Sequence, residues 1–248
     1  MVKQEQQDFL KDSTLIIAVL YRMPDIVKVV IDNVLSIISG RPNTWIVLIN
    51  NNAEEGIKNY FDSVDHKQCL KIDLPFNFGR GLACNFFIKE YLSNNNLPKT
   101  IIALDPDIIF TKESFEKLVE AAEQLPQCGM IGMRYKNNEC NPERNLFFKP
   151  KTLIGINKKK FKLSSPFMCN VAGGIFAIEA KKITTLCDYQ LFPKKKIRVY
   201  GGDDSALYNC LRWKCINGYL EGTQAIHLTS AGCISEEFLE IKNNHKRQ

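Results

Sequence analysis

Apolar residues in the first half of the chain alternate between two spacings. Compact runs of β-branched and large apolar residues are typical of buried strands. They cover Thr14 to Leu20, Trp45 to Ile49, Cys69 to Leu74 and the stretch that starts at Thr100. Apolar residues at helical spacing lie between these runs, in Pro24 to Gly40, Ala53 to Phe61 and Gly81 to Leu92. Three strand–helix units followed by a further strand predict a parallel, doubly wound sheet.

The second half predicts fewer regular elements. Glu113 to Leu125 has helical spacing, and Met130 to Arg134 has the composition of a strand. Tyr135 to Asn170 is rich in Asn, Pro and Lys and has no clear period, so we expect an irregular segment there. Two interpretations stay open for this segment: an acceptor-binding loop or lid, and a disordered surface excursion.

Two pairs of glycines mark the region after residue 170. Val171 to Ile178 is an apolar run that predicts a strand, and its Gly173-Gly174 pair would let a ligand or another backbone approach closely. Further on, Gly201-Gly202-Asp203-Asp204 leads into a predicted helix from Ser205 to Ile216. Helix capping explains one carboxylate at that position, but it requires neither the second carboxylate nor the two glycines.

Composition is that of one soluble domain. The chain has 248 residues, of which 45% are hydrophobic and 24% charged, enough for one large α/β core. Its nine cysteines are odd in number, which favours reduced thiols over a disulfide framework. The first residues contain no apolar signal-peptide core, and no run approaches the roughly 18 apolar residues of a membrane span. We therefore expect a cytoplasmic protein.

The net charge of +6 is unevenly distributed. Lysines cluster between residues 149 and 162, a second basic group spans residues 194–198, and Lys246 and Arg247 close the chain. These clusters are interpreted either as a solvated surface or as an attraction to a phosphate-bearing acceptor or the anionic inner face of a membrane. Nucleic acid is not expected, because stacking aromatics are not interleaved with the basic residues. The tail from Ser235 predicts a short amphipathic helix that packs on its own domain or rests on a membrane.

The strand that starts at Thr100 stops abruptly at Asp105-Pro106-Asp107. Pro106 cannot continue a strand, so both carboxylates fall at its C-terminal edge, where open α/β sheets bind ligands. Two carboxylates one residue apart can both reach a divalent cation, or share it with a ligand hydroxyl. Taken alone, the pattern fits a simple Asp-Pro turn equally well.

Four segments together resemble glycosyltransferases of the family 2 type, which have the nucleotide-sugar-binding GT-A fold. The segments are Asn77 to Asn85, Asp105-Pro106-Asp107, the two glycine pairs with Asp203-Asp204, and Ala225 to Leu228. The resemblance covers nearly everything from Thr14 to Leu228. It implies a single α/β domain over residues 1–248, with a Rossmann-like, mostly parallel central sheet flanked by helices and a mixed acceptor-side half. Residues 14–134 would bind the donor, 135–228 would form the acceptor and catalytic half, and 229–248 would be a tail.

The resemblance also implies roles for individual residues. The metal, Mn²⁺ or Mg²⁺, would be held by Asp107 and His227, with Asp105 at the metal or on the hydroxyls of the donor sugar or ribose. Such a cation would neutralise the charge that grows on the diphosphate leaving group. Asp204 would be the general base and Asp203 would orient the acceptor. The implied donor-side residues are Asn50, Asn77, Gly79, Arg80, Asn85 and Asp105, and the implied acceptor-side residues are Gly173, Gly174 and Gly202.

The implied activity is the inverting transfer of a hexosyl or N-acetylhexosaminyl group to a hydroxyl of a glycan or lipid-linked acceptor, as in polysaccharide biosynthesis. One departure weakens the expectation of a UDP-sugar donor: Asn50 stands where the family usually has an aspartate that accepts from uracil. No role is carried onto Arg212, because the arginine of the family pattern is displaced. Two alternatives stay open, a Mg²⁺-dependent phosphatase of the haloacid dehalogenase type and a non-catalytic sugar-nucleotide-binding module.

Overall fold

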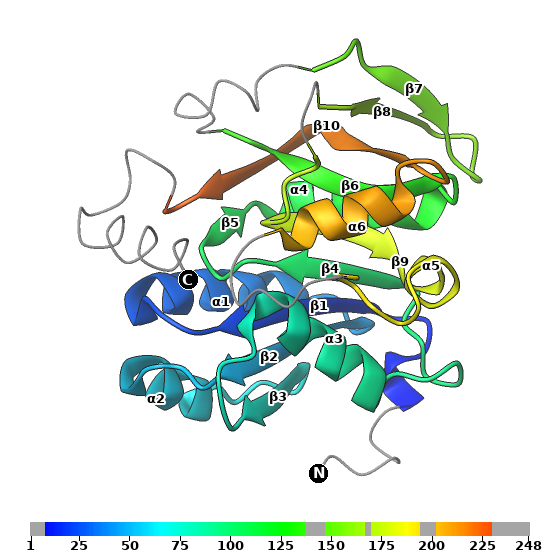
Figure 1. Cartoon of the computed structure of the whole chain (residues 1–248). Coiled ribbons are helices and arrows are strands. Elements are labelled where there is room, and N and C mark those ends of the chain that lie inside the picture. The colour runs from blue at the N-terminus through cyan, green and yellow to red at the C-terminus, as the bar shows by residue number, and fades with distance from the viewer. Residues whose placement is uncertain (1–7, 137–146, 167–169, 194–201, 230–248) are drawn as a thin grey trace.

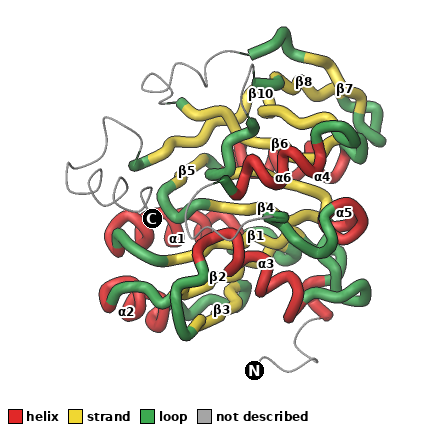
Figure 2. The backbone as a smooth tube through the Cα atoms, in the orientation of Figure 1, coloured by secondary structure: helices red, strands yellow, loops and turns green. Residues whose placement is uncertain are grey.

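The protein is a ten-stranded sheet with helices on both faces (Figure 1 and Figure 2). The computed structural model describes residues 8–136, 147–166, 170–193 and 202–229. After a 3-10 turn at Asp8–Leu10, the first half contains β1 (Thr14–Leu20), α1 (Pro24–Ile38), β2 (Thr44–Asn51), α2 (Glu55–Ser63), β3 (Cys69–Leu74), α3 (Gly79–Tyr91) and β4 (Thr100–Leu104). The second half contains β5 (Ile108–Phe110), α4 (Lys112–Gln124), β6 (Cys128–Tyr135), β7 (Lys151–Ile154), β8 (Lys160–Ser164), β9 (Ile175–Glu179), α5 (Ala180–Leu186), α6 (Asp203–Leu211) and β10 (Ile216–His227).

The first half confirms the predicted parallel sheet. Its strands lie in the order β3-β2-β1-β4, and all three pairings are parallel. Every residue of β1 and β4 is buried, which explains their uninterrupted apolar runs. The chain runs outward from β1 to β2 and β3 and then returns to the other side of β1 with β4. The carboxyl ends of β1 and β4 therefore form the topological switch point where such sheets bind ligands.

The second half is mixed, as the resemblance implied. β9 is antiparallel to both of its neighbours, β4 and β6, whereas β10 is parallel to β6. The strand predicted from Val171 begins only at Ile175, so that prediction is wrong for its first four positions. The Gly173-Gly174 pair precedes the strand because the Gly173 carbonyl oxygen accepts from a side chain, Arg80, instead of joining a ladder.

The expected irregular segment from Tyr135 to Asn170 is partly regular, which corrects the prediction. β7 and β8 form an antiparallel hairpin, and β8 joins the sheet beside β10. Phe161 and Leu163 of β8 are buried while Lys160 and Lys162 are exposed. This is the alternation of a strand with one buried face, and it was not recognised because its outward positions are lysines in a lysine-rich segment. Residues 137–146 and 167–169 of the segment lie outside the described residues.

The last strand is much longer than predicted. β10 has 12 residues, and the helix expected to reach Ile216 ends at Leu211. Between Leu220 and Gln224 the register shifts, and Gly222 takes a φ of +76° there. This bend interrupts the apolar pattern and explains why only the end of the strand was predicted. The bend also lets β10 pair with the short β5, which directly follows Asp107.

The helices are divided between the two faces of the sheet. α1 and α4 share one face, where Arg41 beyond the end of α1 lies 3.6 Å from Glu116 of α4. α3 and α6 share the other face, where Arg80 and Asp204 both contact Gly173. Helices on both faces of a mostly parallel sheet confirm the predicted fold class, whereas the division into donor and acceptor halves stays a prediction.

Several predictions fall outside the described residues. They are the second basic cluster at residues 194–198, Gly201 and the tail from residue 230 onward. No helix in the described ranges combines the length and the apolar character that crossing a bilayer requires. The described cysteines are free thiols.

The packing of β9 predicts a large difference between two aromatic truncations. Phe176 in this central strand is fully buried, whereas Trp213 after α6 is 84% exposed. We expect Phe176→Ala to lower the free energy of unfolding by about 3 to 5 kcal/mol, because it leaves a cavity between β4 and β6. Trp213→Ala should change the free energy by less than about 0.5 kcal/mol. Urea unfolding measures both, and equal losses would contradict this assignment of the core.

Candidate active site

Arg80, in the first turn of α3, connects the two halves of the sheet at their carboxyl edge. Its Nε lies 2.8 Å from Oδ1 of Asp105, the residue directly after β4. Its Nη2 donates to the Gly173 carbonyl oxygen, and its Cζ lies 4.8 Å from the centroid of the Phe192 ring. The Arg80 and Asp105 side chains are only 23% and 28% exposed. An ion pair, a hydrogen bond and a cation–π contact therefore hold the Arg80 guanidinium between β4 and the residues that lead into β9.

The Asp105 carboxyl lies among opposing charges. Its pKa is raised to about 7, chiefly by burial; Asp107 adds to the rise and Arg80 opposes it. A cation that enters beside Asp105 would favour the charged form. A carboxyl perturbed in this way, at the ligand-binding edge of an open sheet, is typical of a functional site.

Two residues after Asp105, the side chain of Asp107 meets those of His227 and Thr229. His227 Nε2 lies 3.0 Å from Asp107 Oδ2, and the Thr229 hydroxyl donates to the same carboxylate oxygen. The backbone supports this arrangement, because β5 and β10 pair His227 with Ile108 and the Leu228 N–H donates to the Asp107 carbonyl oxygen at 2.8 Å. Residues 120 apart in sequence are thus held at one point.

The Gly173-Gly174 pair makes room for side chains from three other elements. A Cβ on Gly173 would lie 2.8 Å from Asp204 Cβ and 3.0 Å from Arg80 Nη1. A Cβ on Gly174 would lie 2.5 Å from the hydroxyl of Tyr135, at the end of β6. Tyr135 was missed by the sequence reasoning, although its place at the carboxyl end of a buried strand was a usable signal.

The start of α6 presents two carboxylates with different surroundings. Gly202 precedes the helix with a φ of +78°, a conformation that favours glycine, and a Cβ there would meet no atom within 4 Å. Asp203 is buried at 6% exposure. Asp204 accepts the Gly173 N–H at 3.3 Å and the Ser205 N–H at 3.0 Å, so its carboxylate is turned toward the glycine pair.

Asn50, the second-last residue of β2, pairs with Asp73 of β3. Its Nδ2 donates to Asp73 Oδ1 at 2.7 Å, and its Oδ1 accepts the Ala53 N–H at 3.1 Å. The amide is therefore already used on both sides, while the Asp73 side chain is 49% exposed and its Oδ2 lies 3.4 Å from Lys58 Nζ. Asp73 is a second residue that the sequence reasoning missed. Its signal was register, because it lies directly opposite Asn50 in the parallel pair.

Asn77 and Gly79 form the turn into α3. Asn77 Oδ1 accepts the Gly79 N–H at 2.8 Å and the Nδ2 of Asn51 at 2.7 Å, and the Asn51 Oδ1 accepts the Phe78 N–H at 2.9 Å. Gly79 has a φ of +71°. These bonds attach the turn to the end of β2 and so set the position of Arg80.

Asn85 lies deeper in α3. Its amide donates to the Phe192 carbonyl oxygen at 2.9 Å and accepts the Phe192 N–H at 3.0 Å. A direct contact with a donor would require both bonds to break, so the geometry favours an indirect role in which Asn85 holds Phe192 beneath Arg80. The structure connects the other predicted residues along one edge of the sheet: Asn50, Asn77, Gly79, Arg80, Asp105, Asp107, Gly173, Gly174, Gly202, Asp203, Asp204 and His227.

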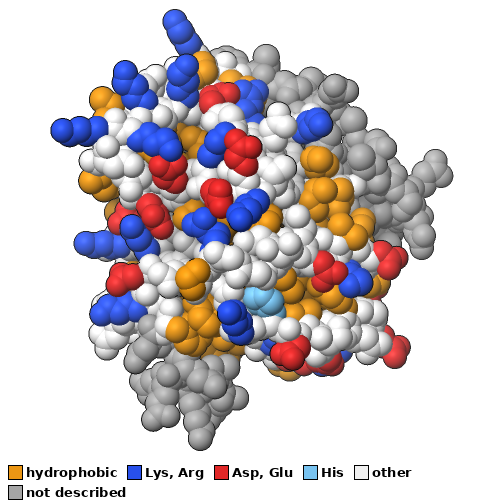
Figure 3. All heavy atoms as spheres, turned by 180° about the vertical axis from the view of Figure 1, so that it is seen from behind, with side chains coloured by type: hydrophobic (Ala, Val, Ile, Leu, Met, Phe, Trp, Pro, Cys, Tyr) orange, Lys and Arg blue, Asp and Glu red, His pale blue; other side chains and the backbone are white. Residues whose placement is uncertain are grey.

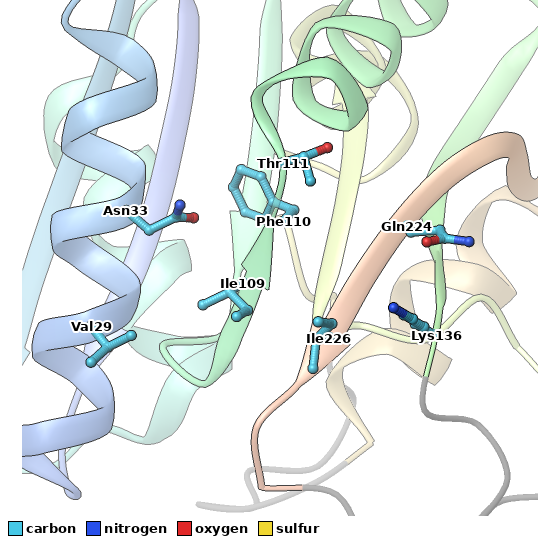
Figure 4. A pocket seen from close by; sticks show the side chains of 8 residues that line it. All are labelled: Val29, Asn33, Ile109, Phe110, Thr111, Lys136, Gln224 and Ile226. Atoms are coloured by element: carbon cyan, nitrogen blue, oxygen red, sulfur yellow. The ribbon is translucent and has the colours of Figure 1, made fainter.

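A pocket of about 280 Å³ lies on the other face of the sheet, between α1 and the β5–β10 pair (Figure 4). Val29, Ile109 and Ile226 line it together with Lys136. Ile109 and Ile226 are partners in the β5–β10 ladder, one position from Ile108 and His227. Because successive side chains alternate between the faces of a sheet, the pocket is separated from His227 by the β5–β10 backbone. None of the predicted site residues lines it.

Residues 14–181, about two thirds of the chain, match the model of the family described as glycosyl transferase family 2. The chain belongs to glycosyl transferase family 2. The match spans the sheet from β1 to β9 and includes Asn50, the α3 turn, Asp105, Asp107 and the Gly173-Gly174 pair. This membership confirms the resemblance that the four sequence segments indicated. It also removes the phosphatase alternative.

Solved structures support the GT-A fold. Mannosyltransferase PcManGT from Pyrobaculum calidifontis, in complex with GDP-Man and Mn²⁺, matches with a TM-score of 0.65 at 11% identity, over 95% of this chain and 61% of its own. GalNAc-T7 with UDP, GalNAc and Mn²⁺ matches with a TM-score of 0.59 at 12% identity, over 88% of this chain and 44% of its own. S. aureus TarS 1–349 in complex with UDP-GlcNAc matches with a TM-score of 0.59 at 13% identity, over 94% of this chain and 65% of its own.

These likenesses concern the fold alone. The chain spans less than two thirds of the length of each of these three proteins. No curated protein sequence matches it significantly.

The residues present fit a divalent cation. Asp107 Oδ2 and His227 Nε2 are 3.0 Å apart, and two adjacent ligands of an octahedral ion with bonds of about 2.1 Å are about 3 Å apart. The described residues hold no cluster of three His, Cys, Asp or Glu side chains suited to a metal. A site built from one carboxylate and one imidazole would leave coordination positions for a diphosphate and water, which is typical of catalytic metal sites.

The glycine pair gives a matched test of the geometry. Gly173→Ala should lower the free energy of unfolding by about 1 to 3 kcal/mol, because its methyl group would press on Asp204 and Arg80. Gly40→Ala is the control, since no atom lies within 4 Å of the added Cβ. We expect the control to change the free energy by less than about 0.5 kcal/mol. Equal effects in urea unfolding would show that Gly173 is not closely packed.

Proposed function

We propose that this protein is a metal-dependent, inverting glycosyltransferase. It moves a hexosyl or N-acetylhexosaminyl group from a nucleoside-diphosphate sugar, in our proposal a UDP-sugar, to a hydroxyl of a glycan or lipid-linked acceptor. The observation that carries the proposal is the meeting of the Asp107–His227 pair, Asp105 and Asp204 at one edge of the sheet. Family membership and the GT-A fold support glycosyl transfer, and the three similar structures named above contain nucleotide or nucleotide-sugar ligands.

In the proposed donor site, the nucleoside lies across the carboxyl ends of β1, β2 and β3, the place where open sheets bind nucleotides. Asp73 takes the role of accepting from the base, because its side chain is half exposed whereas Asn50 is buried. The Asn77 to Arg80 turn and Asp105 face the ribose, diphosphate and sugar.

The metal would be held by Asp107 and His227, and Thr229 orients the carboxylate. Bound there, Mn²⁺ or Mg²⁺ would supply positive charge next to the departing diphosphate.

Asp204 is the proposed general base. An acceptor hydroxyl attacks the anomeric carbon, its proton passes to the Asp204 carboxylate, and the electron pair of the breaking C–O bond leaves with the diphosphate oxygen. The Gly173 and Ser205 N–H groups hold the carboxylate in place. Asp203, which is nearly covered, supports this helix start and orients the acceptor from beneath. A single base and direct attack give inversion.

The nucleotide-sugar assay tests the reaction itself. A panel of UDP- and GDP-sugars should include one from which the protein releases nucleoside diphosphate with Mn²⁺ or Mg²⁺ and not with a chelator. We expect the anomeric configuration of the product, read by nuclear magnetic resonance, to be opposite to that of the donor. Release of inorganic phosphate from phosphomonoesters without sugar-nucleotide turnover would contradict glycosyl transfer. Tight sugar-nucleotide binding without turnover would favour the binding module.

Asp107→Asn should remove metal binding together with activity. Replacing one carboxylate oxygen by an amide nitrogen weakens binding of a cation that prefers oxygen ligands, so we expect Mn²⁺ affinity to fall by about tenfold or more. Electron paramagnetic resonance of free Mn²⁺ measures the affinity without any turnover. Asp65→Asn is the control, an exposed aspartate before β3. Unchanged Mn²⁺ affinity in Asp107→Asn would exclude Asp107 as a ligand.

Asp204→Asn should separate catalysis from donor binding. Loss of a general base typically costs about 100- to 10,000-fold in kcat, and the same loss is expected here. Donor affinity should stay within about twofold, because Asp204 faces the acceptor side. Equilibrium titration with the donor and single-turnover kinetics measure the two quantities. A variant that loses donor affinity and keeps its rate of transfer would overturn the assignment.

The acceptor and the cellular location belong to the same proposal. A lipid-linked acceptor would require the protein to reach a membrane from the cytoplasm, where nucleotide sugars would be supplied. Peripheral contact through basic surface patches would serve this need.

A further inference from the structure

The β7–β8 hairpin presents large apolar side chains to solvent. Phe148 before β7 is 53% exposed, Ile154 at the end of β7 is 63% exposed, and Ile156 in the turn is 71% exposed. The hairpin packs on the rest of the protein through its opposite face, where Phe161 and Leu163 are only 6% and 1% exposed. The exposed residues are therefore not needed for the fold of the hairpin.

The turn that carries Ile156 is fixed to α4. The Ile156 N–H donates to the Gln124 carbonyl oxygen at 3.0 Å, and the Asn157 N–H donates to the Gln124 side chain at 3.0 Å. Lys159 completes the attachment through an ion pair with Glu120 at 2.6 Å. Gly155 allows the close approach to α4, since a Cβ there would lie 3.0 Å from Gln124 Cβ. Ile156 is thus held in solvent by a fixed turn.

Lysines surround these apolar residues. In the β7–β8 ladder, Lys160 lies opposite Ile154 and Lys162 lies opposite Thr152, so both lysines share the outer face with Ile154. Lys149, Lys151 and Lys158 are exposed nearby. None of these five lysines makes an ion pair with another residue of the described ranges. In the view from behind, positive side chains gather at the upper left, over this hairpin (Figure 3).

We propose that the outer face of the β7–β8 hairpin binds an anionic lipid surface, with Ile154 and Ile156 inserted among the headgroups. Apolar side chains that enter the interface combined with lysines that remain at headgroup level are the chemistry such a surface recognises. An anionic glycan would contact the lysines and leave the isoleucines without partners. A second copy pairing along β7 would bring like charges together, and lysines on an edge strand oppose that pairing.

This surface lies outside the candidate active site, so its test needs no substrate. The purified full chain is mixed with sedimenting vesicles of equimolar phosphatidylcholine and phosphatidylserine, and separately with vesicles of phosphatidylcholine alone. We expect binding to the anionic vesicles, weaker binding at high salt, and little binding to the neutral vesicles.

Two double variants separate the apolar and the electrostatic contributions. Ile154→Ser with Ile156→Ser should weaken binding to anionic vesicles by about tenfold or more without changing the charge. Lys160→Gln with Lys162→Gln should weaken it by about tenfold and reduce its salt dependence. The matched control is Lys67→Gln with Lys181→Gln, which removes the same charge from exposed positions before β3 and on α5. Because all six positions are exposed, the thermal unfolding of the variants should equal that of the unchanged protein.

Each other outcome overturns the proposal. Failure of the unchanged protein to bind anionic vesicles would exclude a lipid surface as the partner. An equal loss in the Lys67 and Lys181 control would mean that net charge, and not this hairpin, drives adsorption. A change from dimer to monomer on replacing the isoleucines would assign the face to contact between copies of the chain. Nucleotide-sugar turnover is measured separately, so failure here leaves the proposed enzymatic function untouched.

Discussion

The candidate site depends on the Arg80 guanidinium, which occupies the position where the two halves of the sheet meet. Its contacts with the Asp105 carboxylate, the Gly173 carbonyl oxygen and the Phe192 ring join β4, the approach to β9 and the segment beyond α5. A partly buried cation of this kind is stable only when its partners are fixed, because removal of any partner leaves charge without compensation. The positions of the residues at the carboxyl edge of the sheet therefore follow from the need to compensate the Arg80 charge. These residues include Asp105 and Asp204, the carboxylates that we propose for donor binding and catalysis.

Close approach without side chains is the second constraint. Asp204 from α6 and Tyr135 from β6 reach the edge only because Gly173 and Gly174 leave the space that Cβ atoms would fill. Gly202 at the start of α6 serves a different purpose, because it adopts a positive φ while a Cβ there would meet no atom within 4 Å. Gly173 and Gly174 therefore mark the place where α3, α6 and β6 meet the approach to β9. In a protein whose halves belong to one continuous sheet, these contacts give the site its rigidity.

The sequence predicted the parallel half well because its strands are buried on both faces and bounded by clear helices. β3 matched residue for residue, and β1 also kept its predicted bounds. Prediction failed where tertiary contacts override local pattern. Gly173 leaves the strand pattern because its carbonyl serves Arg80, and β8 was obscured because its outward positions are lysines. For the candidate site, motif order singled out Asp105, Asp107, Asp204 and His227, and their roles there stay predictions. Asp73 was missed because strand register reveals its place, and Tyr135 was missed although it ends a buried strand, because its role beside Gly174 is a tertiary contact.

In the function we propose, one edge of the sheet holds the metal, the nucleotide and the general base. The most direct measurement is anomalous diffraction at the manganese absorption edge from crystals containing Mn²⁺ and a nucleoside diphosphate. We expect one strong manganese peak in contact with Asp107 and His227, with the diphosphate bound to it on the side that faces Arg80. A manganese peak elsewhere, or a nucleotide bound in the pocket between α1 and β10, would contradict it.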